Sequence, residues 1–173
     1  GRTLLITPNL KGIKDGLNRI QPPIGPMIMA NVLKSRGHDS YIHDCALEGW
    51  NRQIELDKKT VIIGQSDEDI AKLIDNYQPD ITGISALFSN LMESAHNIAR
   101  IIKEVRPNSK VVLGGNHISN AISDYIYARD NTDSGIPIRL KDMEDVNIDY
   151  AMRGECDFAF SDFADAYFNS KDF

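Results

Sequence analysis

Two short groups of small residues follow predicted strands, and they are the parts of this sequence best suited to binding chemistry. Ser85-Ala86-Leu87 ends one apolar stretch, and after 26 further residues Gly114-Gly115 ends another. The serine offers a hydroxyl group, and the glycines offer bare backbone with unusual conformational freedom. In an open α/β fold, residues at the carboxyl ends of the strands lie where ligands bind. This arrangement favours a flat, bulky ligand with a long tail.

Strands and helices alternate along the chain, which predicts an α/β fold. Apolar stretches predict strands at 3–7, 39–44, 80–86, 110–113 and 148–152. Helical spacing of apolar residues, with caps and stop signals, predicts helices at 24–36, from Ser66 or Asp67 to Pro79, and at 91–105, 118–128 and 160–167. We therefore expect a doubly wound parallel sheet of about five strands, whose strand-to-helix loops share one edge because crossovers are right-handed.

Three stretches do not fit this alternation. Residues 8–23 are predicted to form a long loop rich in glycine, lysine, asparagine and proline. Residues 45–65 show no clear pattern, apart from a candidate strand at 60–63. Residues 129–147 are polar and are predicted to form an irregular insertion.

The composition indicates one globular domain over residues 1–173. A net charge of -6 without a lysine or arginine run argues against nucleic-acid binding. Because no apolar run approaches the roughly 20 residues of a membrane span and no signal-like start is present, we expect a cytoplasmic protein. Cys45 and Cys156 do not suggest a disulfide framework. Since the first strand begins almost at residue 1, we expect a fragment of a longer protein.

Other kinds of site have less support. His43 and Cys45 lie close in sequence but lack the further ligands of a zinc site. The dinucleotide fingerprint Gly-x-Gly-x-x-Gly is absent. A response-regulator receiver needs acidic residues after the first strand, an aspartate after the third and a lysine after the fifth. At those points the chain has Pro8-Asn9, Ser85 and Arg153.

Three further motifs occur in order around the serine and the glycines. Pro22-Pro23-Ile24-Gly25 opens the first predicted helix, Asn116-His117 extends the paired glycines, and Asp149–Glu155 ends in Arg-Gly-Glu. Together they resemble the N-terminal cobalamin (vitamin B12)-binding domain of cobalamin-dependent radical S-adenosylmethionine enzymes. The resemblance covers nearly the whole chain and implies a Rossmann-like or flavodoxin-like cobalamin-binding fold.

The resemblance also implies which residues contact the cofactor. Ser85 and Leu87 would line a channel for the nucleotide tail, with the serine hydroxyl bonded to the tail base. Backbone amides near Ser89 and Asn90 would receive the tail phosphate. No catalytic residue and no metal-ligating side chain is expected in this chain. The expected cofactor-binding residues are Asn9, Pro23, Gly25, Ser85, Ala86, Leu87, Ser89, Asn90, Gly114, Gly115, Asn116, His117, Gly154 and Glu155.

The loop expected to face the lower side of the cobalt contains no histidine. Methionine-synthase and mutase-type cobalamin domains carry Asp-x-His-x-x-Gly after the first strand, and that histidine binds cobalt from below. Between Pro8 and Gly25 this chain has only polar or apolar candidates such as Asn9, Leu10, Ile20 and Gln21. The resemblance therefore implies base-off cobalamin without a protein imidazole ligand.

By resemblance, this chain binds cobalamin at the sheet edge and presents the cobalt to a radical S-adenosylmethionine domain of the same polypeptide, for methyl transfer. That domain would hold S-adenosylmethionine and a four-iron four-sulfur cluster, since two cysteines cannot supply the three thiolates of its motif. The chain alone would perform no turnover, and its parent would be the methyltransferase.

The alternative is a non-catalytic, cobalamin-responsive or scaffolding domain that binds a protein partner through residues 129–147. Three closely spaced cysteines further along the polypeptide would favour the enzyme.

Overall fold

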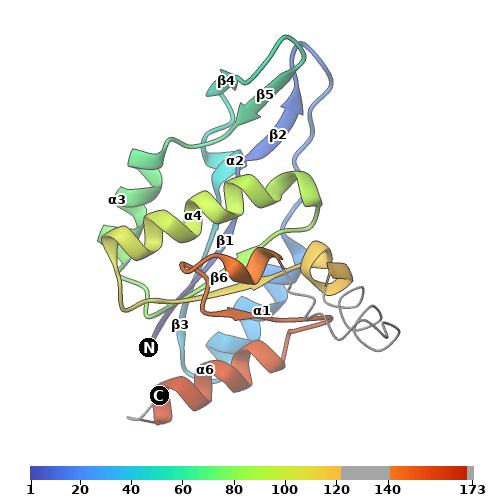
Figure 1. Ribbon diagram of the computed structural model, residues 1–173. Helices are drawn as coiled ribbons and strands as arrows, with labels where there is room; N and C mark the ends of the chain where they lie inside the picture. The colour runs from blue at the N-terminus through green and yellow to red at the C-terminus, as the bar shows by residue number, and fades with distance from the viewer. Residues whose placement is uncertain (122–140, 171–173) are drawn as a thin grey trace, which may run out of the picture.

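A five-stranded parallel sheet forms the centre of the computed structural model, which describes residues 1–121 and 141–170. The spatial order of its strands is β3-β1-β6-β7-β8 (Figure 1). Counted along the chain, this is the 2-1-3-4-5 order of flavodoxin-like folds. The predicted doubly wound α/β fold is confirmed. The strands are β1 (Arg2–Thr7), β3 (Asp39–Asp44), β6 (Ile81–Ser85), β7 (Lys110–Gly114) and β8 (Tyr150–Ala151).

Helices cover both faces of this sheet (Figure 1). One face packs against α3 (Asp67–Tyr77) and α4 (Met92–Val105), and the other against α1 (Ile24–Ser35) and α6 (Ala159–Asn169). Successive strand residues point to opposite faces, so the buried run of β1 supplies both cores. Leu4 and Ile6 belong to the α3/α4 core, whereas Leu5 belongs to the α1/α6 core.

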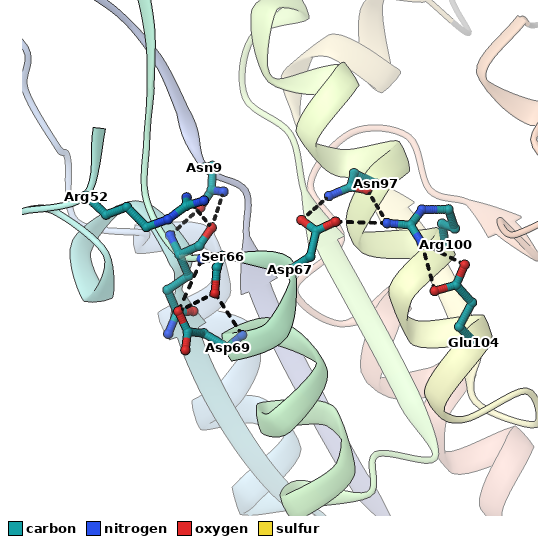
Figure 2. Close-up of polar contacts among 9 residues, drawn as sticks. Asn9, Arg52, Ser66, Asp67, Asp69, Asn97, Arg100 and Glu104 are labelled. Atoms are coloured by element: carbon teal, nitrogen blue, oxygen red, sulfur yellow. Dashed lines mark hydrogen bonds and ion pairs between the residues drawn. The ribbon is translucent and has the colours of Figure 1, made fainter. Parts of the chain in front are cut away.

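The start of α3 follows a local signal in the sequence. The hydroxyl of Ser66 accepts a hydrogen bond from the backbone N–H of Asp69 at 3.1 Å, and the Asp69 carboxylate accepts one from the backbone N–H of Ser66. This reciprocal capping box makes Ser66 the cap, a choice that the sequence left open. Asp67 instead contacts Asn97 and Arg100 of α4, at 2.8 and 3.0 Å (Figure 2).

A second, antiparallel sheet stands beyond the carboxyl end of β1 (Figure 1). It consists of β2 (Leu10–Ile13), β5 (Thr60–Ile63) and β4 (Gln53–Glu55), in the order β2-β5-β4. The strand at 60–63 is confirmed, but the prediction of a loop over all of residues 8–23 was wrong. The four residues of β2 contain a glycine and carry no clear pattern, so only pairing with the distant β5 defines them as a strand.

Two predicted segments lie partly outside the described residues, and the stretch that the sequence left unassigned contains a helix. Helical structure begins at residue 116 and is described up to 121, while 122–128 lie outside the described residues. Of the predicted insertion, 129–140 also lie outside them, and Lys141–Glu144 form a 3-10 turn. Within the stretch left unassigned, Cys45–Glu48 form the short helix α2.

None of the helices within residues 1–121 and 141–170 combines the length and apolar character needed to cross a membrane. The same part of the chain contains no group of three or more histidine, cysteine or acidic side chains arranged to hold a metal ion.

Candidate functional site

A pocket of about 380 Å³ opens at the carboxyl ends of β1 and β6. These two strands are neighbours in the sheet, and the chain leaves them toward opposite faces. In open α/β folds, ligands bind at such a topological switch point. The walls come from the loop after β1, the first turns of α1, the loop after β6 and the segment from Gly154 to Asp157. The pocket therefore occupies the edge where the sequence placed the site.

Large apolar side chains line the pocket and remain exposed. Ile24 of α1 is 64% exposed, and Leu87 and Phe88 after β6 are 42% and 58% exposed. Leu10 and Ile20 add apolar surface from the loop after β1. Apolar side chains gathered in a pocket, with a few polar groups among them, are typical of small-molecule and cofactor sites.

A narrow groove continues from the pocket between the sheet and helices α1 and α6. The pocket and the groove share Pro26, Met29, Ser85 and Cys156, and the groove itself measures about 40 Å³. Because β-strand side chains alternate, the groove floor is formed by the residues of β6 and β7 that face α1 and α6. Gly83 and Gly114 are among them, so the floor is open where other residues would place side chains.

Gly114 leaves space that a side chain would occupy. It pairs with Ser85 in the register of β6 and β7, so the two lie side by side on the same face of the sheet. A Cβ atom at Gly114 would have only the backbone oxygen of Met152, at 4.0 Å, within 4 Å. The absence of a side chain at Gly114 therefore keeps the groove open, as a narrow extension of a ligand would require.

Gly115 has a different role, because it allows two backbone segments to approach closely. Its φ is +107°, and a Cβ atom there would lie 2.4 Å from the backbone oxygen of Ala86. The backbone N–H of Ala86 in turn donates to the oxygen of Gly114 at 2.9 Å. Only glycine fits this position without displacing the loop after β6.

Most of the residues expected to bind a cofactor lie in the pocket or the groove. Ser85 lines both, and Gly114 lines the groove. The others in the pocket wall are Pro23, Gly25, Leu87, Gly115, Gly154 and Glu155.

His117 and its neighbours lie outside the pocket wall. The imidazole of His117 forms hydrogen bonds with the hydroxyl of Ser89 at 2.8 Å and with the carboxylate of Asp142 at 3.2 Å. These bonds join the loop after β6 to the segment before β8. The side chain of Ala86 is fully buried in the α3/α4 core. Two further expected residues, Asn90 and Asn116, are also absent from the pocket wall.

Asn9 also lies outside the pocket wall. Its side-chain amide donates to the backbone oxygen of Gln65 and accepts from its backbone N–H, both at 2.9 Å. Arg52 donates to the same backbone oxygen at 3.2 Å, and the three segments meet beside Ser66 (Figure 2). Asn9 therefore joins the second sheet to the start of α3. The other candidates from this loop, Leu10, Ile20 and Gln21, do line the pocket.

The four histidines of the sequence all have partners away from the pocket. His38 contacts Asp165 at 2.7 Å, His43 contacts Gln65 at 2.6 Å, and His96 contacts Asp145 at 2.6 Å. With His117 held as described above, the pocket wall formed by residues 1–121 and 141–170 contains no imidazole.

The family model for the B12 binding domain matches residues 11–136 of this sequence. The chain belongs to the B12-binding domain family. The pocket of this B12-binding domain lies where flavodoxin-like folds bind their ligands, and the resemblance seen in the sequence motifs is confirmed.

Two curated relatives of this B12-binding domain are methyltransferases. Cytidylyl-2-hydroxyethylphosphonate methyltransferase of Streptomyces wedmorensis is 32% identical over 118 residues, which cover 67% of this chain and 22% of the relative. An uncharacterized methyltransferase of Pyrococcus horikoshii is 28% identical over 163 residues, or 94% of this chain and 28% of the relative. The chain thus spans about a quarter of the length of these relatives.

A solved structure shares the fold of this B12-binding domain. The crystal structure of a cobalamin-binding protein from Desulfitobacterium hafniense superposes with a TM-score of 0.52. The match has 13% sequence identity and covers 95% of this chain and 58% of that protein. It supports the flavodoxin-like arrangement of the sheet.

Several pocket and groove residues of the B12-binding domain were not predicted as site residues. Gly83 interrupts the apolar run of β6, and a glycine inside a strand is a signal for close approach of a ligand or another backbone. The remaining residues carry no such signal, because they come together only when distant loops fold over the sheet edge. They include Thr7, Arg19, Pro26, Met29, Asp44, Phe88, Cys156 and Asp157.

Cys156 is the thiol of the B12-binding domain that lines both the pocket and the groove. Burial raises the pKa of this thiol above its ordinary value, and the neighbouring Asp157 carboxylate raises it further. The thiol is therefore protonated at neutral pH and is a weak nucleophile. Burial also raises the pKa of Cys45, which is fully buried away from the pocket.

Proposed function

We propose that this domain holds cobalamin at the carboxyl edge of the sheet and presents its cobalt to a second domain for methyl transfer. The corrin ring lies against the apolar wall formed by Ile24, Leu87 and Phe88. The nucleotide tail enters the groove beside Ser85 and Gly114. The continuous path from the pocket into a groove kept open by Gly114 is the observation that carries this proposal.

The side chains present fit such a ligand. The hydroxyl of Ser85 has no hydrogen bond to any described residue, so it is available to the tail base, as the resemblance implies. Arg19, Gln21 and Glu155 line the pocket and offer hydrogen-bonding groups to the amide side chains of the corrin. A mainly apolar wall with a few polar groups is typical of cofactor sites.

We further propose that the cofactor binds base-off without a protein imidazole below the cobalt. The support is the absence of histidine from the pocket wall formed by the described residues. When bound, cobalamin supplies a cobalt centre able to carry a methyl group. The protein positions the ring, excludes water with its apolar wall and leaves the lower side of the cobalt to non-imidazole groups.

We propose that the second domain belongs to the same polypeptide. The two curated relatives are methyltransferases about four times the length of the matched segment, which leaves room for a catalytic domain in the same polypeptide. The motif resemblance favours a radical S-adenosylmethionine domain, with its own four-iron four-sulfur cluster. This chain then acts as the cofactor carrier.

Spectroscopy of the loaded domain tests this proposal directly. The purified chain, mixed with hydroxocobalamin and desalted, is expected to retain about one corrinoid per chain, because the pocket and groove form one site. The visible spectrum should be of the base-off type. After reduction to cobalt(II), the electron paramagnetic resonance lines should show no splitting from an axial nitrogen.

A His117→Ala variant is the control for the histidine that lies nearest the paired glycines. It should bind with an unchanged spectrum, since the imidazole is held by Ser89 and Asp142 outside the pocket. An axial nitrogen signal that disappears in His117→Ala would contradict the base-off assignment. A well-folded chain that retains no corrinoid would contradict cobalamin binding itself.

Alkylation of Cys156 provides a second test, independent of the spectrum. Because its pKa is raised, reaction of Cys156 with iodoacetamide should be slow at pH 7 and faster as the pH rises. Bound cobalamin should slow this reaction in proportion to the occupied fraction of the chain, since the thiol lines both the pocket and the groove. Peptide mass spectrometry separates Cys156 from the buried Cys45. An alkylation rate unchanged by stoichiometric cobalamin would show that the ligand binds elsewhere.

A further inference from the structure

The groove beneath Ser85 contains very few groups able to form hydrogen bonds. Of its eleven described lining residues, Ser85 and Cys156 alone carry a side-chain hydroxyl or thiol. The Cys156 thiol already lies 3.5 and 3.3 Å from the backbone oxygens of Arg153 and Gly154. One hydroxyl near the mouth is therefore the main polar contact that the described side chains offer to a ligand in the groove.

The backbone offers one acceptor beside Ser85, the oxygen of Met152, which lies 4.0 Å from the position of a Cβ atom at Gly114. Deeper in the groove the backbone groups of the floor are paired within the sheet. Strand β6 lies between β1 and β7, and it is paired with both along the groove floor. The inner end is closed by Leu5, Val112 and Phe160, which are 1–2% exposed. A polar ligand atom placed deeper in the groove than Ser85 thus loses its hydrogen bonds to water and gains none from the described side chains.

The inner end is also too small for a bicyclic ring as it stands. The groove measures about 40 Å³, whereas a cavity of roughly 150 Å³ accommodates a benzene ring. A Cβ atom at Gly83 would lie 3.1 Å from two ring atoms of Phe160, so the phenyl ring packs directly over this glycine. Displacement of the Phe160 ring therefore provides the space for an entering base. Met29 and Met152, also in the groove wall, are flexible enough to follow.

We infer that this groove selects cobalamin-type cofactors with a benzimidazole tail base over analogues with a purine base, and that Phe160 sets the space available. The inference rests on the proposed cobalamin site. A base-off benzimidazole has one free ring nitrogen, which Ser85 satisfies, and an otherwise apolar edge. Adenine carries an amino group and additional ring nitrogens that the described side chains of the inner groove leave unpaired.

Binding of three corrinoids to the 173-residue chain tests the inference. They are cobalamin, its adenine-base analogue and cobinamide, which has no base. Because each buried polar atom left unpaired weakens binding by about tenfold, cobalamin should bind at least about tenfold more tightly than the adenine analogue. Cobalamin should also bind more tightly than cobinamide, since only cobalamin fills the groove.

Two variants assign the effect to the groove. Phe160→Leu enlarges the inner end, so cobalamin should associate several times faster while cobinamide binds as before. Phe168→Leu is the matched control, because Phe168 lies on the same helix, packs against His38 and Tyr167, and does not line the groove. Met152→Gln supplies an amide to the groove and should reduce the preference for cobalamin over the adenine analogue. If Phe160→Leu does not fold, Met152→Gln still tests whether the groove selects the tail base.

The possible outcomes separate this inference from the proposed function. Equal affinity for the two bases, or a cobinamide affinity equal to that of cobalamin, overturns base selection by the groove and leaves the cobalamin site standing. Failure of a folded chain to bind any of the three corrinoids overturns the proposed function itself. A preference for cobalamin that Met152→Gln reduces and Phe168→Leu does not change supports the inference.

Discussion

Replacing Gly114 by valine is expected to weaken cobalamin binding by about 100-fold while the chain stays folded, because the burial of an aromatic base and its hydrogen bond are both lost. A Cβ atom at this position meets only one backbone oxygen, at 4.0 Å, so the backbone accepts a side chain here and that side chain occupies the groove. Valine also suits a β-strand. Equilibrium titration of the visible spectrum measures the affinity, and thermal melting measures the fold.

Cobinamide and a matched strand variant serve as controls for Gly114→Val. Cobinamide has no base to place in the groove, so its affinity should be nearly unchanged. Thr82→Val alters a fully buried residue of β6 that faces the opposite side of the sheet, and it should leave the binding of both corrinoids unchanged. If the Gly114→Val chain bound cobalamin as tightly as the unsubstituted chain, the groove would not be part of the cobalamin site.

Replacing Gly115 by alanine is expected to reduce the stability of the fold itself, by about 3 kcal/mol. Its φ of +107° is unfavourable for alanine, and the new Cβ atom would lie 2.4 Å from the backbone oxygen of Ala86. For a domain of this size, the melting temperature should fall by about 10 °C. Differential scanning calorimetry and chemical denaturation measure this loss, with or without cobalamin.

Gly25→Ala is the matched control for Gly115→Ala. Gly25 lies in the first turn of α1, and a Cβ atom there would have nothing within 4 Å. Alanine is a better helix former than glycine, so the stability should be unchanged or slightly higher. If Gly115→Ala melted at the same temperature as Gly25→Ala, the close approach between Gly115 and Ala86 would not be needed for the fold.

The two adjacent glycines of this motif have different structural roles. The pair was predicted to bring bare backbone to the sheet edge, and both residues do lie there. Gly114 keeps a space open, whereas Gly115 allows two chain segments to touch. The sequence contains no signal that distinguishes these roles, because each depends on neighbours from a different part of the chain.

Partners that are distant in sequence also decide where the polar residues predicted near the cofactor lie. His117 follows the paired glycines in the sequence, yet Asp142, which comes 25 positions later, is one of the residues that hold its imidazole outside the pocket. Asn9 follows the first strand, yet it contacts the backbone of Gln65, 56 positions away. Side-chain direction at a loop is decided by partners that are distant in sequence, so motif position alone does not establish contact with a ligand.

The sequence by itself determined the alternation of strands and helices, a start of α3 at Ser66 or Asp67, and the strand ends that meet at one edge. These features depend on local spacing, caps and the right-handed crossover, which are properties of short segments. Only the tertiary structure decided that β2 pairs with β5, that Gly83 and Gly114 form the floor of one groove, and that Phe160 closes its inner end. Those contacts join segments with no common local pattern, and packing against one sheet is what brings them together.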